Sequence, residues 1–354
     1  MLRFALVGCG RIAKRHGELL GLGKISNAKL VAVCDIDKNK AKALADRFSV
    51  PWYESYDEMM TKESIDVVSV LTESGNHARH VVSLAKYGKH IVVEKPMALT
   101  LDDADMMIRA CDSHGCRLFV IKQNRFNVPV VKLREALEAG RFGKLVLGTV
   151  RVRWCRRQDY YEQDSWRGTW AMDGGVLTNQ ASHHVDLLEW MMGDAVSVFA
   201  KSTTALVNIE AEDTAIVVIK FKNGALGIIE ATTAARPKDL EGSLSILGEH
   251  GSVEIGGFAV NKILHWGFEN QLDSDKEVIE KFSENPPNVY GFGHQAYYEH
   301  VVDSIRNNKK QLIDGLEGRR SLELISAIYE SIETGKEVFL RFTPVKCKLG
   351  HPHE

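Results

Sequence analysis

Apolar and polar residues alternate along the first third of the chain with two different periods. Short apolar runs, such as RFALVGC (3–9), KLVAVCD (29–35) and DVVSVLT (66–72), predict strands. Between them, RIAKRHGELLG (11–21) and NKAKALADRF (39–48) carry apolar residues three and four apart, which predicts helices. Because strands and helices alternate, this region is predicted to be an α/β domain with a parallel sheet.

The pattern changes after about residue 122. Long runs with β character follow, among them LVLGTVRVRW (145–154), TAIVVIKFKNGALGIIEATTA (214–234) and EGSLSILGEHGSVEIGG (241–257). Consecutive strands with few helices between them predict a mixed or antiparallel open-faced sheet, an α+β domain. We therefore predict one domain over residues 1–122, a second over 123–344, and a tail over 345–354.

Composition and charge narrow the class of protein. The chain has 354 residues, 26% of them charged, and a net charge of −2, so no basic field attracts nucleic acid or a membrane surface. No apolar stretch is long enough to span a membrane. Six scattered cysteines form no CxxC pair or disulfide framework, which predicts reduced thiols and a cytoplasmic protein.

A glycine-rich turn joins the first predicted strand to the first predicted helix. It reads Gly8-Cys9-Gly10-Arg11-Ile12-Ala13, and Asp35 ends the next strand. This spacing is typical of dinucleotide binding: the glycines let the backbone approach a pyrophosphate, and the acid accepts hydrogen bonds from the ribose. A carboxylate at Asp35 would repel a 2′-phosphate, so we predict NAD rather than NADP. The alternative is a glycine-rich turn that binds no ligand.

Two further polar groups follow predicted parallel strands. Thr72 ends the third strand and His77 begins the next helix; Glu94-Lys95-Pro96 ends the fourth strand. Ligands of open α/β sheets bind at these carboxyl ends. Lys95 is therefore a candidate to donate to a substrate oxygen. Helix capping and a solvated turn lysine are the alternatives.

A fourth stretch lies among the later strands. Asn179, His183 and Asp186 follow one another at spacings of four and three, which predicts a shared helix face. His183 is a candidate general base with Asp186 as its orienter, and a buried structural histidine is the alternative. No cysteine or further carboxylate–histidine spacing lies nearby, so no metal is predicted.

Together these four stretches resemble the Gfo/Idh/MocA family of nicotinamide oxidoreductases. The family pattern combines G-x-G-x-x-[GA], E-K-P and GG-x-L-x-D-x-G-x-H-x-x-D, and the resemblance covers roughly residues 1–340. Asn179 and Ala181 depart from it, because many members have Asp and Gly there. The resemblance implies an N-terminal Rossmann domain, NAD as cofactor and a C-terminal open-faced sheet domain.

The segments KQNR (122–125), YYEQDSWRGTWAMDGG (160–175) and NQASHHVDLLEW (179–190) are similar to nucleotide-sugar members of the WlbA or WbpB type, which also have Asn at the Asn179 position. This resemblance implies oxidation of C3 of UDP-N-acetylglucosaminuronic acid, with Lys95 and His183 as the catalytic pair in either assignment of roles. It implies bacterial surface polysaccharide biosynthesis as the setting. Cofactor contacts are predicted for Gly8, Gly10, Arg11, Ile12, Asp35, Thr72, His77, Glu94, Lys95 and Gln123, and substrate contacts for Lys95, Asn124, Arg157, Tyr161, Trp166, Arg167, Asn179 and His183.

Other functions stay open at this point. The same family chemistry on an inositol, a free hexose or another amino-sugar nucleotide is one. A dinucleotide-sensing regulatory protein is another, although Lys95 and His183 together argue against it. The predicted open sheet also implies a homo-oligomer, with a tetramer expected.

Overall fold

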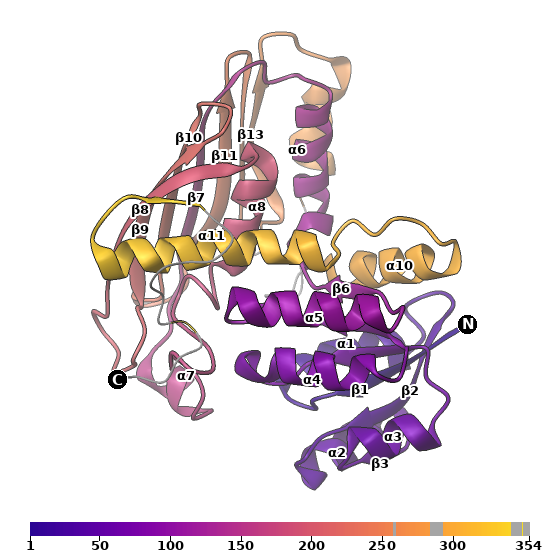
Figure 1. The fold of residues 1–354 in the computed structure, drawn as a ribbon. Coiled ribbons are helices and arrows are strands. Elements are labelled where there is room, and N and C mark those ends of the chain that lie inside the picture. The colour runs from indigo at the N-terminus through magenta and orange to yellow at the C-terminus, as the bar shows by residue number, and fades with distance from the viewer. Residues whose placement is uncertain (258–259, 284–292, 341–348, 350–354) are drawn as a thin grey trace. The chain divides into compact units, whose positions relative to one another are not determined.

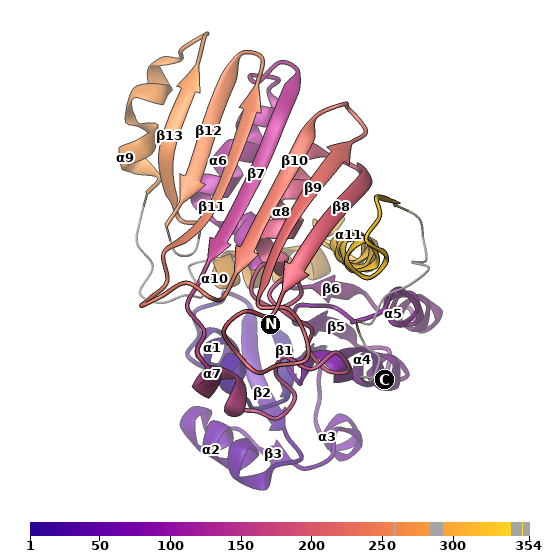
Figure 2. The same ribbon diagram turned by 90° about the vertical axis from the view of Figure 1, so that its left-hand side faces the viewer.

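The computed structural model describes residues 1–257, 260–283, 293–340 and 349. These residues divide into two compact units, which Figures 1 and 2 show as ribbons. The first unit contains residues 1–121 and 294–319, and the second contains the described residues of 122–293 and 320–354. The predicted domain boundary near residue 122 stays a prediction, and the first unit adds residues 294–319 to it. Of the predicted tail only Leu349 is described, and its side chain is buried; the rest lies outside the described residues.

The first unit is built on a six-stranded parallel sheet, in the order β3-β2-β1-β4-β5-β6. The strands are β1 (Leu2–Val7), β2 (Ala28–Cys34), β3 (Trp52–Tyr53), β4 (Val67–Val70), β5 (His90–Val93) and β6 (Leu118–Val120). The helices are α1 (Arg11–Gly21), α2 (Lys38–Phe48), α3 (Tyr56–Lys62), α4 (His77–Ala85) and α5 (Leu101–Ser113), and Figure 1 shows α4 and α5 side by side. This order is that of a Rossmann fold, which confirms the predicted class. The two-residue strand β3 and the helix α3 were not predicted.

The strand order reverses between β1 and β4, where the sheet leaves a crevice for a ligand. Residues of β4 and β5 are buried on both faces, as expected for a parallel sheet covered by helices. Helix α10 (Gly293–Arg306) comes from far along the chain, yet all but its first residue belongs to this unit. Its Tyr298 ring packs edge-on against Phe4 of β1, with centroids 5.6 Å apart.

The second unit is built on an eight-stranded mixed sheet, in the order β13-β12-β11-β7-β10-β9-β8-β14. Its strands are β7 (Leu145–Arg153), β8 (Ala195–Thr203), β9 (Thr214–Phe221), β10 (Leu226–Thr232), β11 (Glu241–Gly248), β12 (Gly251–Gly256), β13 (Lys262–Phe268) and β14 (Val338–Phe339). Strands β7 and β10 pair in parallel and the other pairs are antiparallel, as the sequence predicted for an α+β domain. The predicted hairpin at Asn223-Gly224 joins β9 to β10, with Gly224 at φ +88°.

Helices cover one face of this sheet, as Figure 2 shows for α6 (Val128–Glu138) and α8 (Ser182–Met192). The unit also contains α7 (Gln158–Glu162), α9 (Val278–Lys281) and most of α11 (Gly315–Thr334). The 3-10 helices of the chain are η1 (Ser74–Asn76), η2 (Gln123–Phe126) and η3 (Asp273–Glu277). On the opposite face, side chains alternate between buried and exposed along β9, and Phe199, Ile216 and Val218 are exposed. This open face of the sheet is therefore partly apolar.

Candidate active site

The glycine-rich turn has the geometry that a dinucleotide requires. Gly8 adopts φ +98°, and a Cβ there would lie 2.7 Å from the carbonyl group of Leu71, at the end of the neighbouring strand β4. Only glycine fits such a close approach of two backbones. At Gly10 a Cβ would meet no atom within 4 Å, so the space above this residue is open. Gly10 is also the N-cap of α1 and provides no side-chain cap, which leaves the helix N-terminus available to an anion.

Asp35 ties this turn to the end of β2. One carboxylate oxygen accepts from the backbone N–H of Cys9 at 2.7 Å, and the other from that of Asp37 at 2.8 Å. Nearby at the end of β4, the Thr72 hydroxyl is buried without a hydrogen-bond partner among the described residues. An open cradle, an anchored acid and an unsatisfied hydroxyl fit NAD, with Arg11 and Ile12 in the first turn of α1 beside them.

A pair of glycine substitutions separates cofactor binding from folding. We expect Gly10→Ala to weaken NAD binding at least about tenfold, because its methyl group would occupy the pyrophosphate cradle while leaving φ unstrained. Its melting temperature should stay within about 2 °C of the wild type. Gly8→Ala should instead destabilise the protein by about 2 kcal/mol or more, because of its positive φ and the clash with Leu71. Calorimetric titration with NAD and thermal unfolding measure both; equal effects on the two quantities would contradict this assignment.

His77 holds the ends of β4 and β5 together. Its Nδ1 lies 2.7 Å from the Pro96 carbonyl oxygen and its Nε2 lies 3.0 Å from the Thr72 carbonyl oxygen. The ring is buried, and burial lowers its pKa. A neutral ring has one N–H, so it donates to one of these carbonyl oxygens while its other nitrogen faces the second; because backbone groups enclose both nitrogens, the structure favours a positioning role for His77 over direct cofactor contact.

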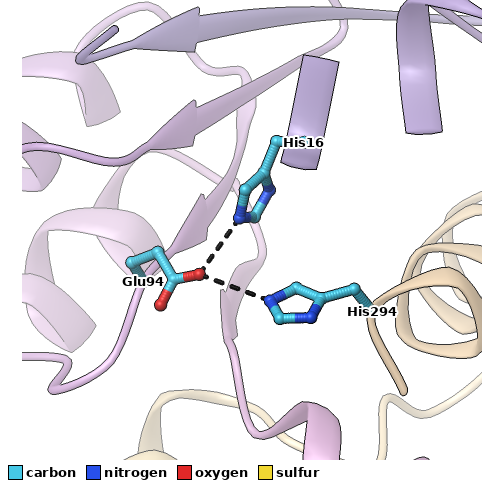
Figure 3. Close-up of side chains that lie close together, drawn as sticks. All are labelled: His16, Glu94 and His294. Carbon is cyan, nitrogen blue, oxygen red and sulfur yellow. Dashed lines mark hydrogen bonds and ion pairs between the residues drawn. The ribbon is translucent and has the colours of Figure 1, made fainter. Parts of the chain in front are cut away.

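Glu94 lies at the end of β5 in the cluster drawn in Figure 3. One carboxylate oxygen, Oε1, is 3.0 Å from His16 Nε2 and 3.7 Å from His294 Nε2. The other, Oε2, accepts from the backbone N–H of Lys95 at 2.9 Å. Burial opposes ionisation of Glu94, but hydrogen bonding by the histidines outweighs it and holds the pKa of the carboxyl well below its ordinary value. Lys95 is thus attached through its backbone to a buried anion.

In the second unit, Gln123 and His183 meet. The Gln123 side-chain amide nitrogen lies 2.9 Å from His183 Nε2. Gln123 comes from η2 and His183 from the first turn of α8, so residues 60 positions apart fix the orientation of one imidazole ring. Asn124, half-buried, is next to Gln123 in the same short helix. An amide nitrogen can only donate, so His183 Nε2 accepts this hydrogen bond and the ring proton lies on Nδ1. If the Gln123 amide turns, its oxygen, which has no partner among the described residues, accepts from Nε2–H and Nδ1 becomes the basic nitrogen.

Asp186 belongs to a buried ionic cluster. Arg125 binds it through two parallel hydrogen bonds of 2.8 Å, and Lys122 Nζ lies 3.4 Å from Asp186 Oδ1. Burial would raise the pKa of the Asp186 carboxyl, but the two cations outweigh it and lower that pKa. Burial also lowers the pKa of Lys122. Asp186, which the sequence predicts to orient His183, is therefore also the counter-ion of two buried cations.

Asn179 precedes helix α8 instead of lying on it. The helix begins at Ser182, so the predicted common helix face holds for His183 and Asp186 but is wrong for Asn179. The Asn179 amide nitrogen donates to Asp173 Oδ1 at 2.7 Å, while Asp173 Oδ2 accepts from the Gly168 backbone at 2.9 Å. A buried carboxylate thus fixes the Asn179 side chain in a turn.

The aromatic and basic segment near α7 is partly self-paired. Arg167 donates to Asp164 and to the Tyr160 hydroxyl, and its guanidinium lies 4.7 Å from the Trp166 ring centroid. The Tyr161 hydroxyl is 3.0 Å from that of Thr233, and the Tyr161 ring is buried. Arg157, the N-cap of α7, has an exposed side chain. Of these predicted substrate contacts, Arg157 is the cation most accessible to an anionic ligand.

Glu212 gives the second unit a pH-dependent stability. Burial raises the pKa of its carboxyl to about 7, although the Leu177 backbone and the Tyr329 hydroxyl hydrogen-bond to it. An acid whose folded pKa is raised contributes stability below its unfolded pKa, about 4.5, and loses it as pH rises to about 7. The free energy of unfolding of the wild-type protein should therefore fall by up to about 3 kcal/mol across that window. Glu212→Gln, which mimics the neutral acid, should abolish this fall. Denaturant unfolding from pH 5 to pH 8 measures it, and an unchanged pH dependence would contradict it.

Several groups of the site were not predicted. His16 and His294 lie against Glu94, Tyr298 bonds to His16, and Arg125 pairs with Asp186. His16 and Tyr298 are 282 positions apart, and no sequence motif links them. The pairing of Asp186 with Arg125 and Lys122 could have been inferred only from the basic segment KQNR (122–125), which directly follows a predicted strand.

Comparisons with known proteins match nearly the whole chain. Residues 2–122 match the NAD-binding Rossmann fold of an oxidoreductase family, and residues 134–340 match the C-terminal α/β domain of that family. The chain is 26% identical to myo-inositol 2-dehydrogenase of Thermotoga maritima, over 96% of this chain and 98% of that protein.

No helix among the described residues combines the length and apolar character that a membrane crossing requires.

Two solved structures are more similar. The WlbA dehydrogenase of Bordetella pertussis, in complex with NADH and UDP-GlcNAcA, is 41% identical, with a TM-score of 0.91 over 96% of this chain and 98% of that one. The WlbA dehydrogenase of Chromobacterium violaceum, in complex with the same two ligands, is 43% identical, with a TM-score of 0.90 over 96% of each chain.

Proposed function

The chain belongs to the Gfo/Idh/MocA family of NAD-binding oxidoreductases, and on this premise we propose that it oxidises C3 of UDP-N-acetylglucosaminuronic acid to the 3-keto sugar. One observation carries the choice of substrate: the 41% and 43% identity, over nearly full length, to two dehydrogenases solved with UDP-GlcNAcA. The inositol dehydrogenase relative is only 26% identical. The proposed setting is the cytoplasmic synthesis of bacterial surface polysaccharide.

The proposed chemistry divides between two side chains. NAD, when bound, accepts a hydride from the carbon that bears the reacting hydroxyl. His183 removes the hydroxyl proton at Nδ1, with the Gln123 amide turned so that its oxygen accepts from Nε2–H and holds the ring in one orientation. Lys95 donates to the same oxygen and stabilises the negative charge that develops on it. Asn179, held by Asp173, orients the sugar. The reverse assignment, with Lys95 as the base and His183 as the donor, uses the same contacts.

The anionic parts of the substrate call for cations and flat surfaces. Exposed Arg157 is the proposed partner of a carboxylate or a pyrophosphate, because arginine binds planar anions through two hydrogen bonds. Arg167 lies over the Trp166 ring and bonds to Tyr160, whose ring packs edge-on against Tyr161. This group supplies the proposed aromatic contacts, and Asn124 adds a polar one. The proposed cofactor set keeps Gly8, Gly10, Arg11, Ile12, Asp35, Thr72, Glu94, Lys95 and Gln123, and His77 acts on it through the ends of β4 and β5 that it contacts.

The test is NADH formation by the purified protein with NAD and UDP-N-acetylglucosaminuronic acid. UDP-N-acetylglucosamine is the matched control substrate, because it differs at C6 by lacking the carboxylate. A second run adds a 2-oxo acid and measures consumption of the uronate, because a bound NADH that the 2-oxo acid reoxidises gives turnover without accumulation of NADH. We expect turnover with the uronate and at least about a hundredfold lower kcat/KM with the control.

Another alcohol is the second candidate, because the inositol dehydrogenase relative aligns over 96% of the chain. Turnover of myo-inositol but not of the uronate would refute the nucleotide-sugar proposal and retain the family chemistry. NAD binding without oxidation of any of these alcohols would favour a dinucleotide sensor.

We also propose that the exposed sheet face mediates association into a homotetramer. Ile216 and Val218 of β9 are 57% and 47% exposed and lie in adjacent outward positions, with Phe199 opposite Val218 on β8. Val218→Asp should lower the mass measured by light scattering, because it would bury a charge in an apolar interface. Lys220→Asp, on the same strand face, is the control for charge alone. A monomeric wild-type mass would contradict the proposal.

A further inference from the structure

A continuous chain of hydrogen bonds runs through the interior of the first unit. The Ser69 hydroxyl is 3.0 Å from the Tyr298 hydroxyl, which is 2.6 Å from His16 Nδ1. His16 Nε2 is 3.0 Å from Glu94 Oε1, and Glu94 Oε2 accepts from the Lys95 backbone. Ser69, Tyr298 and His16 are fully buried, and Glu94 is 7% exposed. This series of hydrogen bonds begins at Ser69 in β4, passes through α10 and α1, and ends at Lys95, which follows β5.

The charges fix the direction of every hydrogen bond in this chain. An ionised Glu94 can only accept, so His16 Nε2 carries the proton that lies between them. Burial lowers the pKa of His16, so the ring is neutral and its Nδ1 holds a lone pair. The Tyr298 hydroxyl must then donate to His16 and accept from Ser69. Each group in the series from Ser69 to Glu94 therefore donates to the next.

His294 supports the same arrangement from α10. Its ring packs edge-on against His16, with centroids 5.4 Å apart at an angle of 84°, and its Nε2 is 3.7 Å from Glu94 Oε1. Figure 3 shows both imidazole rings directed at this one oxygen. The anion thus has a short contact with His16 and a longer one with His294.

A metal ion is the competing interpretation of this cluster. His16, Glu94 and His294 are the one group among the described residues whose ligating atoms, all within 4.8 Å of one another, could hold a metal ion. A zinc ion would need about 2.0–2.1 Å to each nitrogen, with both nitrogens unprotonated. The direct contact between His16 and Glu94 would then have to open. The satisfied chain through Tyr298 favours the hydrogen-bonded state without a metal.

We propose that Ser69, Tyr298 and His16 form a buried relay that keeps Glu94 ionised and fixed, and that Glu94 in turn positions Lys95 for the oxidation. The inference rests on the proposed function, because the action of Lys95 on a substrate hydroxyl is assigned there. His16 and Tyr298 are positioning residues: they act through Glu94 and the Lys95 backbone, without contact with the reacting atoms.

The relay explains why a carboxylate precedes the lysine. The Lys95 N–H donates to Glu94 Oε2 across a single residue, so any rotation of that carboxylate moves the backbone from which the Lys95 side chain extends. The carboxylate is held at its other oxygen by the Nε2–H of His16, and the Tyr298 hydroxyl fixes the same ring by donating to its Nδ1. Because a small error in the position of a reacting group lowers the rate by a large factor, loss of these hydrogen bonds should lower kcat measurably.

A double-mutant cycle tests the relay. We expect His16→Leu to lower kcat about a hundredfold in the wild-type background and at most about threefold in the Lys95→Ala background, because its effect passes through Lys95. Tyr298→Phe should lower kcat about three- to tenfold. His16→Gln, which keeps a donor toward Glu94, should recover at least about ten times the kcat of His16→Leu. KM for NAD should stay within about twofold of the wild-type value for the His16 and Tyr298 variants in the wild-type background. The cycle uses whichever alcohol the wild-type protein oxidises, so a wrong substrate proposal leaves it valid.

The matched control is Tyr53→Phe, which deletes a hydroxyl that donates to Glu63 elsewhere in the same unit and should leave kcat unchanged. Melting temperatures are recorded for every variant. Equal losses from His16→Leu in both backgrounds would show a merely structural histidine and overturn the relay. A stoichiometric transition metal in the purified protein, lost in His16→Leu, would overturn it as well. A rescue by glutamine together with non-additivity would establish it.

Discussion

Replacing Lys95 by alanine is expected to lower kcat/KM for the nucleotide sugar at least about a thousandfold. The variant loses both a hydrogen bond to the reacting hydroxyl and the charge opposite the developing oxyanion, and each such loss costs about a hundredfold or more. The backbone of Lys95 is held by Glu94 and stays in place, so NAD affinity should fall much less than kcat/KM, by about tenfold or less. Steady-state kinetics and calorimetric titration with NAD measure the two effects.

Two further variants sharpen this expectation. Lys24→Ala removes an exposed lysine from the same unit and should change neither quantity. Lys95→Arg keeps the charge but changes the donor geometry, so its activity should lie between those of the wild type and the alanine variant. A kcat/KM for Lys95→Ala within tenfold of the wild-type value would exclude Lys95 from the chemistry and leave His183 as the sole candidate.

Replacing Asp186 by asparagine is expected to destabilise the protein by about 3–5 kcal/mol. The change is almost isosteric, but it leaves Arg125 and Lys122 buried with no anion between them. Removing one partner of a buried ion pair costs this much because the remaining charge has lost its hydration and its counter-charge. Denaturant unfolding at neutral pH measures the free energy of unfolding.

Asp194→Asn is the matched control for that substitution. Asp194 pairs with Arg320 at 2.8 Å, but its side chain is 64% exposed, so the same change should cost less than about 1 kcal/mol. The Asp186 contribution also depends on pH. Its folded pKa is lowered, so its stabilisation is present above the unfolded pKa, about 3.9, and is lost as pH falls below it. A cost below 1 kcal/mol for Asp186→Asn would show that the cluster hydrates or rearranges.

The glycine-rich turn could be predicted from the residues next to it in the sequence. Strand, turn and helix follow one another within about 20 residues, and each glycine has a requirement that can be derived from backbone geometry alone. The structure bears this out at Gly8, whose positive φ and close approach to Leu71 exclude a side chain. The same local logic predicted the Asn223-Gly224 hairpin.

The partners of Glu94 could not be predicted from the residues next to it in the sequence. The motif Glu94-Lys95-Pro96 was predicted to end a strand, but nothing near it in sequence revealed the histidines or the tyrosine that surround its carboxylate. Tyr298 and His294 come from α10, which follows most of the second unit's strands along the chain yet packs with the first unit. Its two polar groups look like ordinary helix residues until the helix is placed.

The sequence by itself determined the two kinds of sheet, the dinucleotide turn and the candidate pair Lys95 and His183, because hydrophobic periodicity and backbone requirements act over a few neighbouring residues. Only the tertiary structure decided that Arg125 and Lys122 surround Asp186, that Asn179 precedes α8, and that His16 and Tyr298 hold Glu94. The physical reason is that burial makes an unpaired polar group costly, and the partner that satisfies it comes from wherever the fold brings one within hydrogen-bonding distance.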